Sequence, residues 1–371
     1  MRTSKSFVFV DMAGQSLSDP NCIPVHACDL YRPGEAVFGF ALREQPCKEE
    51  DERDSWPGEY HFPAVPTFFV EVPSGNYKVQ IVLGHPSRPG STTVKAGQGH
   101  LLANEIPSEA GQSISVSSAV HVEDGRFKLA FMGAAPAVQS VSMERAADAP
   151  TIFLAGDSTV TDQASGQYPY AGWGQMLSLF LNASVSVSNR ARSGRSSKSF
   201  ITEGRLDWIW NHIKPGDFLF VQFAHNDEKD NAGGTKPFTT YQQYLKQYLD
   251  GAKARGAAPV LISPMHRRFW ESDGRIQNTH GEYIEAMRLL AEAEQVAFID
   301  LAAESKRLFE QLGEEETKRI FMWTAPGEYP NFPEGTADNT HFKATGAIEI
   351  AGLVAGAFEG VPLLAALLKR P

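Results

Sequence analysis

Three short segments of this chain carry the residue types that cleave carboxylic esters. Ser158 follows Gly156 and Asp157 at the end of an apolar run, and Asn226 closes another apolar run. Asp338 and His341 stand three residues apart near the C-terminus. Ester hydrolysis needs a hydroxyl nucleophile, a base for its proton, a carboxylate that fixes the tautomer of that base, and donors for the oxyanion. The order Ser, Asn, Asp, His supplies each part and predicts an esterase.

Each of these residues also has an ordinary structural interpretation. Ser158 and Asp338 suit the N-cap of a following helix, and Asn226 suits a turn. All four, however, fall at the edges of predicted strands or helices. Their joint occurrence favours the catalytic interpretation over a set of unrelated caps and turns.

The elements that must position these residues begin only after residue 148. Residues 1–148 contain short β-branched or aromatic runs divided by turn signals, a pattern typical of an antiparallel β-sandwich. The predicted strands are 7–10, 36–42, 67–72, 77–83, 113–116 and 127–131. The acidic stretch 49–54 is predicted to be a solvated loop. We expect a jelly-roll-like sandwich whose carbohydrate-binding role rests on analogy of fold alone.

Residues 149–371 alternate strands with helices. The predicted strands are 151–155, 185–187, 218–223, 259–262 and 296–301, and the predicted helices are 173–181, 201–213, 240–254, 281–294 and 343–358. This alternation predicts a flavodoxin-like, three-layer α/β/α domain with a parallel sheet. Active groups of such sheets gather beyond the carboxyl ends of the strands, where Ser158 and Asn226 fall.

The same segments resemble the four conserved blocks of the SGNH (GDSL-type) hydrolases. The blocks are Gly-Asp-Ser-Thr at 156–159, Ser-Gly at 193–194, His-Asn-Asp at 225–227 and Asp-Asn-Thr-His at 338–341. Within that superfamily, the segments 170–174, 189–200, 203–205 and 223–229 are similar to the rhamnogalacturonan acetylesterases. The resemblance covers about residues 151–358.

The resemblance implies a role for each matching residue. Ser158 would be the nucleophile, His341 the base and Asp338 its orienting acid. The oxyanion hole would consist of the backbone N–H groups of Ser158 and Gly194 and the side-chain amide of Asn226. Glycine would let a carbonyl oxygen come close to a backbone N–H, and the Asp would reach the imidazole from the same loop. No metal or cofactor is expected.

One position departs from the family pattern. The third block usually begins with Gly, and Ala224 stands there in this chain. The added methyl group removes no hydrogen-bond donor, so we expect activity to be retained.

Substrate contacts are predicted around Gly194. Arg190, Arg192, Arg195 and Lys198 form a cationic run. The run is either ordinary surface charge that holds the loop or a site that attracts a galacturonate-containing polyanion, because a planar guanidinium suits carboxylates. We take Arg192, Arg195 and Lys198 as candidate substrate contacts.

Three further residues have two interpretations each. Trp173 and Tyr170 either stack on sugar rings or pack in the core. His225 is either a second acid–base group or a structural residue, since its neighbour Asn226 carries the family role. Trp173 and His225 are carried forward as candidate substrate contacts.

Composition limits the partners of the protein. The chain of 371 residues has a formal net charge of −10 and an ordinary charged content of 21%. This acidic balance argues against nucleic acid or an anionic membrane as the main partner. No stretch approaches the roughly 18 apolar residues of a membrane span, and the N-terminal segment turns polar too soon for a signal peptide. We therefore expect a cytoplasmic protein.

The cysteines indicate thiols rather than a disulfide framework. Cys22, Cys28 and Cys47 are an odd number near the N-terminus. A disulfide framework normally shows an even set, and no paired CxxC or HxxxH spacing supports a metal site.

Together these observations predict a two-domain serine esterase that removes acetyl groups from pectic carbohydrate, either rhamnogalacturonan or its oligosaccharides. The alternatives are an SGNH lipase, thioesterase or broad esterase, and a non-catalytic carbohydrate-binding protein. The sugar, the acetyl position, the oligomeric state and the role of the first domain are left open by the sequence.

Overall fold

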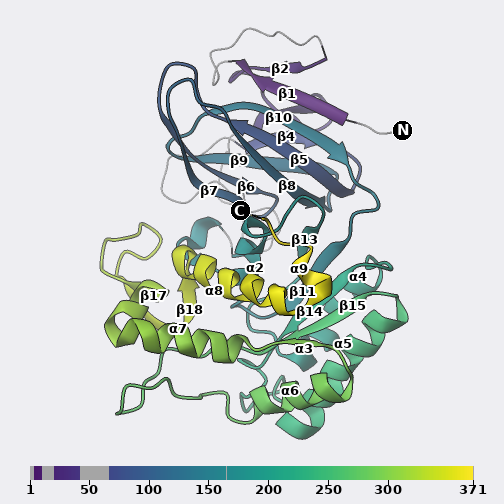
Figure 1. Cartoon of the computed structure of the whole chain (residues 1–371), viewed down its shortest axis with the longest axis vertical. Coiled ribbons are helices and arrows are strands. Elements are labelled where there is room, and N and C mark those ends of the chain that lie inside the picture. The colour runs from purple at the N-terminus through teal and green to yellow at the C-terminus, as the bar shows by residue number, and fades with distance from the viewer. Residues whose placement is uncertain (1–3, 11–20, 42–66, 164, 371) are drawn as a thin grey trace.

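The protein divides into an antiparallel part and a parallel part along its long axis. The computed structural model describes residues 4–10, 21–41, 67–163 and 165–370. Figure 1 shows strands β1 to β10 at one end and the parallel sheet with its helices at the other. The predicted acidic loop 49–54 and Cys47 lie outside the described residues.

The antiparallel part consists of two five-stranded sheets. The first has the order β2 (Ile23–Val25), β1 (Ser4–Phe9), β10 (Val138–Arg145), β5 (Gly75–Leu83) and β8 (Ile114–Val122). The second has the order β3 (Phe38–Ala41), β4 (Thr67–Glu71), β9 (Arg126–Ala135), β6 (Gly90–Ala96) and β7 (His100–Ser108). Only β1 and β2 pair in parallel among the described strands of these sheets.

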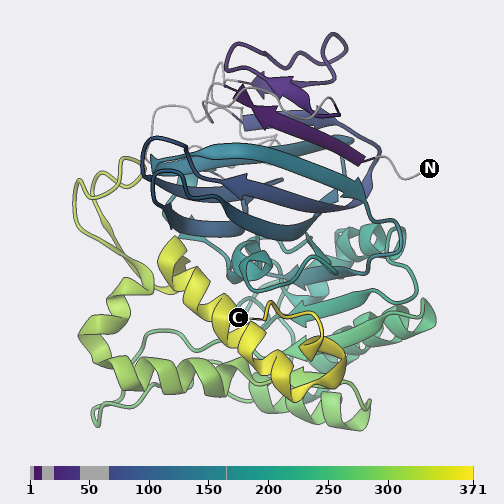
Figure 2. The ribbon, with the colours of Figure 1, turned by 45° about the horizontal axis from the view of Figure 1, so that its top comes forward.

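Large apolar side chains fill the space between these two sheets. Phe7, Phe68, Ile81 and Leu129 are all 0% exposed, and the rings of Phe9 and Phe68 meet edge to face with centroids 5.0 Å apart. Alternate residues of each strand thus face a common core, as in packed sheets generally. The predicted β-sandwich is confirmed, and Figure 2 shows its layers.

The parallel part is built on a five-stranded sheet. Its order is β13 (Ser186–Asn189), β11 (Thr151–Gly156), β14 (Phe218–Gln222), β15 (Ala258–Ile262) and β16 (Ala297–Ile299), and all neighbours are parallel. The first strand in sequence therefore lies second in the sheet, which is the flavodoxin-like arrangement. Every residue of β11 and β14 is buried, because helices cover both faces. The predicted fold is confirmed.

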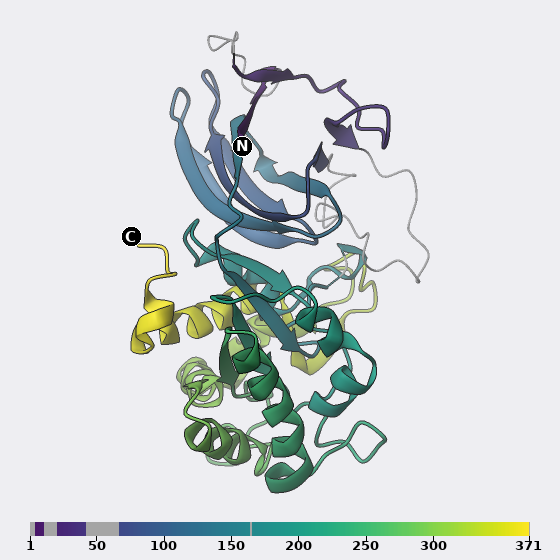
Figure 3. The ribbon, with the colours of Figure 1, turned by 90° about the vertical axis from the view of Figure 1, so that its right-hand side faces the viewer.

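Successive residues of β14 enter opposite cores. Phe218 and Phe220 pack on the face covered by α2 (Trp173–Met176), α7 (Leu301–Glu316), α8 (Ala344–Gly356) and α9 (Pro362–Ala365). Leu219 and Val221 pack on the face covered by α3 (Ser197–Thr202), α4 (Arg205–Trp210), α5 (Gln242–Ala254) and α6 (Tyr283–Ala293). Figure 3 shows these layers from the side. Within the described part of the chain, no helix is long and apolar enough to cross a bilayer.

Short helical turns complete this part of the chain. They are η2 (Ser165–Gln167), η3 (Leu177–Leu179), the π-helical turn η4 (Pro237–Tyr241), η5 (Thr317–Arg319) and η6 (Ala357–Gly360). Two predicted helices are shorter than expected. The helix predicted at 173–181 is α2 followed by η3, and that predicted at 201–213 is divided into α3 and α4 by Gly204, whose φ is +73°.

The structure contains elements between residues 301 and 343 where the sequence predicted none. Helix α7 begins after Asp300, whose side chain accepts a hydrogen bond from Ala303 N at 3.0 Å. Strands β17 (Phe321–Thr324) and β18 (Thr336–Lys343) then form an antiparallel sheet with β12 (Tyr170–Ala171). Asp338 and His341 therefore lie in β18 rather than in the predicted loop.

A buried polar cluster joins the two parts. Asn76 of β5 donates to Ala149 O at 2.8 Å and to Thr151 Oγ1 at 2.9 Å. Its Oδ1 accepts from Ser186 Oγ at 2.8 Å and lies 2.6 Å from His121 Nδ1. The predicted division after residue 148 falls between β10 and β11, within this cluster.

Candidate active site

Three segments that carry predicted site residues leave the same edge of the parallel sheet. Ser158 follows β11, Gly194 follows β13 and Asn226 follows β14. These strands are adjacent and parallel, so their carboxyl ends meet at one edge. The sheet thus brings together residues that are far apart in sequence.

A tight turn presents Ser158 at that edge. A Cβ at Gly156 would lie 2.7 Å from Val160 Cγ2, so only glycine fits there. Asp157 Oδ1 accepts from both the backbone N and the Oγ1 of Thr159 at 2.9 Å, and burial raises the pKa of this carboxyl. Gln163 Nε2 donates to Ser158 O at 2.9 Å. Ser158 caps no helix, which removes its alternative structural interpretation.

Ser158, His341 and Asp338 form a continuous hydrogen-bonded relay. Ser158 Oγ lies 2.9 Å from His341 Nε2, and His341 Nδ1 lies 2.7 Å from Asp338 Oδ2. An ionised carboxylate only accepts, so Nδ1 carries a proton and Nε2 of the neutral ring accepts from the serine hydroxyl. This is the tautomer that a general base for Ser158 requires.

A bulge in β18 allows Asp338 to reach His341. The register with β17 changes from Phe321↔Phe342 to Trp323↔Ala337, which leaves three extra residues in β18. Asp338 Oδ1 accepts from Thr340 N at 2.7 Å and His341 N at 3.1 Å, and this closes the bulge. Helix α8 is instead preceded by Lys343 at its N-cap, so Asp338 is not a helix cap.

The carboxyl of Asp338 stays ionised because of these bonds. Burial, the largest single influence, raises its pKa, but the hydrogen bonds from His341 and the two backbone amides outweigh burial and lower the pKa to about 2. Asp338 therefore keeps its negative charge near neutral pH.

The expected oxyanion donors lie in the segments that follow β11, β13 and β14. Among the described residues, the backbone N–H groups of Ser158 and Gly194 have no protein acceptor. Gly194 has a φ of +79°, and nothing lies within 4 Å of where its Cβ would be. Glycine is thus needed at this position for its positive φ. The predicted reason, close approach of a carbonyl oxygen to the backbone N–H, is not the one that the surroundings of Gly194 indicate. Asn226 is 7% exposed, with Nδ2 3.1 Å from Arg195 O.

Asp227, for which the sequence predicted no role, joins the Asn226 segment to the start of α3. Its carboxylate accepts from Ser197 N at 3.1 Å, from the Ser197 hydroxyl, and from Thr235 Oγ1 at 3.2 Å. Burial is the main cause that raises its pKa, to about 7. The only sequence signal for Asp227 was its position directly after Asn226.

Two predicted substrate contacts are wrong. Trp173 is 0% exposed, and its indole nitrogen donates to Gln222 Oε1 at 2.9 Å, so it is a core residue. His225 is 3% exposed, with Nε2 3.1 Å from Met265 Sδ and its ring edge against His280. Burial lowers the pKa of His225 well below its usual value, so the ring is neutral and structural.

Tyr170 forms one wall of the site. Its ring stands edge-on to the His341 ring, with centroids 5.0 Å apart. Burial raises the pKa of Tyr170 above its ordinary value, so the phenol is neutral. Tyr170 therefore packs against the relay.

A groove of about 940 Å³ lies between the sandwich and the parallel domain. Its lining includes Gln163, which donates to Ser158 O, and Tyr170, which packs against His341, whereas Ser158 and His341 are not part of its described lining. Residues of β7, β8 and β9 line the opposite wall. Of the predicted cationic contacts, Arg192 and Arg195 line the groove, whereas Lys198 is absent from its described lining.

Metal-binding residues do not gather elsewhere in the described part of the chain. Within residues 4–10, 21–41, 67–163 and 165–370, no group of three or more His, Cys, Asp or Glu side chains is arranged to hold an ion. No disulfide joins the described Cys22 and Cys28.

A flavodoxin-like sheet that carries a Ser–His–Asp relay at the carboxyl ends of its strands defines the molecule as a serine hydrolase of the α/β/α class. The chain belongs to the GDSL-like lipase/acylhydrolase family, whose model matches residues 154–347. It is accordingly a carboxylic ester hydrolase, a reaction that the relay can perform.

Two proteins that the chain resembles are named rhamnogalacturonan acetylesterases. Over 221 residues, the chain is 48% identical to rhamnogalacturonan acetylesterase RhgT of Bacillus subtilis, covering 59% of this chain and 94% of that protein. It is 28% identical over 236 residues to the rhamnogalacturonan acetylesterase of Emericella nidulans, covering 58% and 87%. The resemblance to the rhamnogalacturonan acetylesterases is thereby confirmed.

A solved structure that matches both parts of the chain comes from Bacillus subtilis. The crystal structure of the Bacillus subtilis protein YxiM has a TM-score of 0.53 and 24% identity, and the match covers 97% of this chain and 99% of that one. The likeness shows that the fold, a sandwich followed by the parallel domain, occurs in another protein.

Proposed function

We propose that this protein is a serine esterase that removes acetyl groups from rhamnogalacturonan or its oligosaccharides through an acyl-enzyme. The observation that carries the proposal is the Ser158–His341–Asp338 relay, with distances of 2.9 and 2.7 Å. The relay lies in a chain 48% identical to an enzyme named rhamnogalacturonan acetylesterase.

In the first half-reaction, Ser158 Oγ attacks the acetyl carbonyl while His341 Nε2 takes the hydroxyl proton. Asp338 holds the resulting imidazolium through Nδ1. The oxyanion accepts hydrogen bonds from the N–H groups of Ser158 and Gly194 and from Asn226 Nδ2. Collapse breaks the bond to the sugar oxygen, which takes the proton from His341.

In the second half-reaction, a water molecule attacks the acetyl-Ser158 carbonyl and gives its proton to His341. The same donors stabilise the second tetrahedral oxyanion. Acetate leaves, and the proton on His341 returns to Ser158 Oγ. The protein's own groups therefore suffice for every proton transfer in the cycle.

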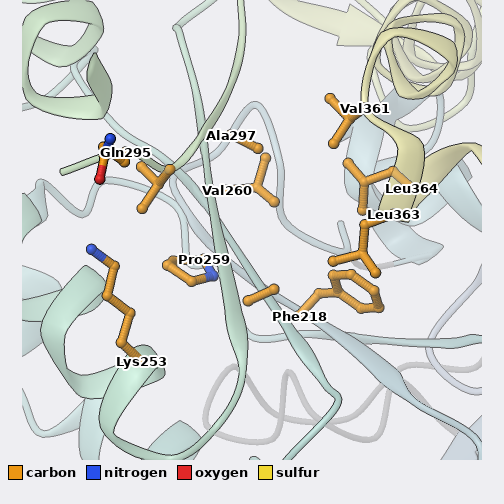
Figure 4. Close-up of a pocket in the computed structure, with 11 residues that line it drawn as sticks. Phe218, Lys253, Pro259, Val260, Gln295, Ala297, Val361, Leu363 and Leu364 are labelled. Atoms are coloured by element: carbon orange, nitrogen blue, oxygen red, sulfur yellow. The ribbon is translucent and has the colours of Figure 1, made fainter. Parts of the chain in front are cut away.

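A long-chain lipase is the less favoured alternative because of where the apolar cavity lies. An apolar pocket of about 220 Å³ is lined by Phe218, Ala258 and Val296, close to the amino ends of the parallel strands (Figure 4). Ser158 lies at the carboxyl ends, so this pocket is on the opposite edge of the sheet. The groove whose lining includes Gln163 and Tyr170 is instead lined largely with charged and polar side chains.

Acetate release from a panel of acetylated polysaccharides tests the proposal. Acetylated rhamnogalacturonan should be a much better substrate than acetylated neutral polysaccharides, and acetyl nitrophenyl ester should exceed the octanoyl ester. Preference for octanoyl would favour the lipase alternative. Failure to react with a fluorophosphonate would favour the non-catalytic, carbohydrate-binding alternative.

A further inference from the structure

The side chain of Lys229 bonds to the amide of Asn226. Lys229 Nζ lies 2.7 Å from Asn226 Oδ1, and Asn226 Nδ2 donates to Arg195 O at 3.1 Å. A lysine only donates and a carbonyl only accepts, so both partners require the same orientation of the amide. One Nδ2 hydrogen is used by Arg195 O, and among the described residues the other has no acceptor.

The backbone of the turn after β14 places Lys229 beside Asn226. Lys229 N donates to Asn226 O at 3.4 Å, and Lys229 O accepts from Asn231 N at 3.0 Å. As in a helical turn, side chains three residues apart lie on one side. A Cβ at Gly234 would lie 2.1 Å from Lys229 O, so the chain packs closely against this carbonyl. The backbone of Lys229 is therefore held in place, although the residue is exposed.

The two ends of this hydrogen bond differ in their surroundings. Lys229 is exposed, whereas Asn226 is only 7% exposed. A bond between two exposed groups contributes little, because water competes for both partners. Here the charge of the lysine acts on the oxygen of a buried amide, where electrostatic interactions are less screened than on an open surface.

We propose that Lys229 is a positioning residue that orients and polarises Asn226 for the oxyanion. This inference rests on the proposed function, because it requires that Asn226 donates to the oxyanion formed at Ser158. A cation on the amide oxygen withdraws electron density from the nitrogen and strengthens its remaining N–H as a donor. The bond to Arg195 O ties this amide to the segment that carries Gly194. Because negative charge develops on the acetyl oxygen only in the transition state, Lys229 should affect kcat more than KM.

Substitutions of Lys229, measured on p-nitrophenyl acetate, test this role without a sugar. Lys229→Met and Lys229→Gln should lower kcat and kcat/KM together, about five- to tenfold, because the lost interaction strengthens only in the transition state. Lys229→Arg keeps the charge and should restore part of the loss. Lys236→Met, which removes the charge of an exposed lysine in the following loop, is the matched control and should leave both constants unchanged.

A double-mutant cycle shows whether Lys229 acts through Asn226. In the Asn226→Ala background, Lys229→Met should cause no further loss. Additive losses would show that Lys229 acts independently of Asn226 and would overturn the inference. A change confined to KM would also overturn it, because Lys229 would then be a ground-state contact. Wild-type kcat in both Lys229→Met and Lys229→Gln would overturn it as well.

Two further measurements complete this test. The rate of covalent labelling by a fluorophosphonate supplies the same cycle if the double variant turns over too slowly to follow. Thermal unfolding of each variant separates a catalytic loss from a loss of folded protein. Wild-type activity in Ser158→Ala would contradict the proposed function itself, whereas additive losses in the cycle would leave that function intact.

The bulge of β18 carries a second, independent inference. Asn339 stands in this bulge between Asp338 and His341, and Arg268, in the segment after β15, bonds to it twice. Arg268 N donates to Asn339 O at 2.8 Å, and Arg268 Nη1 donates to Asn339 Oδ1 at 3.3 Å. Trp323 Nε1 of β17 donates to the same Oδ1 at 2.9 Å. Groups outside β18 therefore hold the bulge.

The side chain of Arg268 is itself fixed by its other contacts. The residue is 5% exposed, and its guanidinium carbon lies 4.8 Å from the centroid of the Trp323 ring. Nε donates to Thr317 Oγ1 at 3.2 Å, and Nη2 donates to Glu314 O at 2.5 Å. Each nitrogen of the guanidinium thus has a partner. Arg268 cannot turn away from the bulge without leaving buried polar groups unpaired, which is costly.

We infer that Arg268 is a positioning residue that keeps Asp338 on His341 by fixing the bulge between them. The bonds that Asp338 Oδ1 accepts from Thr340 N and His341 N lie within the bulge, so they move with it. The bonds from Arg268 to Asn339 instead anchor the bulge to the segment after β15. The inference rests on the proposed function, because it concerns the relay that carries out that reaction.

Loss of this anchor should lower kcat more than KM. Arg268→Met should lower kcat on p-nitrophenyl acetate about tenfold or more, because a small displacement of a catalytic group is costly. Asn339→Ala, at a half-buried position, removes only the side-chain bonds and should cause a smaller loss in the same direction. Arg319→Met is the matched control: this arginine pairs with Glu316 and Glu349, and kcat should be unchanged.

A cycle with Asp338→Asn shows whether Arg268 acts through the relay. In that background Arg268→Met should cause no further loss, measured as the rate of fluorophosphonate labelling, because the carboxylate that it positions is absent. Additive losses would overturn the inference. A kcat within twofold of wild type in both Arg268→Met and Asn339→Ala would also overturn it, as would an equal loss in Arg319→Met. If thermal unfolding shows that Arg268→Met does not fold, Asn339→Ala decides the question.

Discussion

Two buried asparagines, one at the interface between the domains and one at the active site, differ in how many hydrogen-bonding positions of their amides are used within the protein. Asn76, between the domains, uses all four hydrogen-bonding positions of its amide within the protein. Asn226, at the sheet edge, uses its oxygen and one N–H and leaves the other N–H without an acceptor among the described residues. A fully satisfied amide stabilises the fold, whereas an unsatisfied donor beside a nucleophile is available to a reaction.

The same contrast extends to the neighbouring backbone. The N–H groups of Ser158 and Gly194 also lack protein acceptors in the described part of the chain, although Ser158 is only 8% exposed. Such groups are costly to leave unpaired, and both follow the carboxyl ends of adjacent parallel strands. We therefore expect substitutions at the interface to lower stability and substitutions at the sheet edge to lower catalytic activity.

Replacement of the nucleophile should have the largest effect. Ser158→Ala should lower kcat by about 10⁴ or more, since the loss of a triad member removes covalent catalysis. Thermal unfolding should be little changed, because the hydroxyl at the end of β11 bonds to His341 and contributes little to packing. Turnover within tenfold of wild type would place the nucleophile at another residue.

Loss of the available amide donor should come next. Asn226→Ala should lower kcat by about 10²–10³, the usual scale for one oxyanion donor, with a smaller change in KM. Steady-state kinetics on a small acetyl ester measures this directly. If only KM rises, Asn226 binds the ground state of the substrate, and the contrast between a catalytic Asn226 and a structural Asn76 is wrong.

The interface asparagine should give the opposite result. Asn76→Ala should lower the free energy of unfolding by about 1–3 kcal/mol, because it leaves buried partners on Thr151, Ser186 and Ala149 unpaired. Thermal or urea unfolding measures the loss, and kcat of the folded variant should stay near wild type. Asn104→Ala, at an exposed position of β7, is the control. A selective fall in kcat would mean that the interface also serves catalysis.

The smallest expected effect is a pH dependence at the interface. His100 of β7 lies 2.8 Å from Asp162, four residues after Ser158. Burial lowers the pKa of His100, but Asp162 outweighs it and the net pKa is raised. The pair therefore stabilises the fold below the unfolded value of about 6.5, and this contribution is lost as pH rises through the higher folded value.

The melting temperature of wild type should accordingly exceed that of His100→Gln most at mildly acidic pH. The difference should shrink as pH rises. A difference that is independent of pH would show that the imidazole contributes by packing rather than by charge.

Prediction from sequence succeeded where a local pattern sufficed. The strands predicted at 151–155 and 218–223 correspond to β11 and β14. They could be predicted because strands buried on both faces are almost entirely apolar. Helix α7 was missed because the alternation of strand and helix ended at 301, and its amphipathic pattern is interrupted at Gly313, which has a φ of +79°. Strand β18 was missed because its Asp-Asn-Thr residues suit a loop or a helix cap, whereas they form a bulge within the strand.

Single residues were harder to predict than elements. Trp173 and His225 stand next to family motifs, but each points into a core that strands distant in sequence create. Lys198 belongs to the predicted cationic run, yet the helical turn of α3 separates it from the described lining of the groove. The cytoplasmic location expected from the N-terminal residues stays a prediction.

The sequence alone determined the parallel sheet and the residue types of the relay, because apolar periodicity and short motifs are local properties of a chain. Tertiary structure decided which polar groups remain available. Whether an amide is satisfied depends on partners that are distant in sequence, such as Arg195 for Asn226 and Ser186 for Asn76. The groove, too, exists only because β8 and β9 pack against the segment after β13. No local pattern encodes that contact.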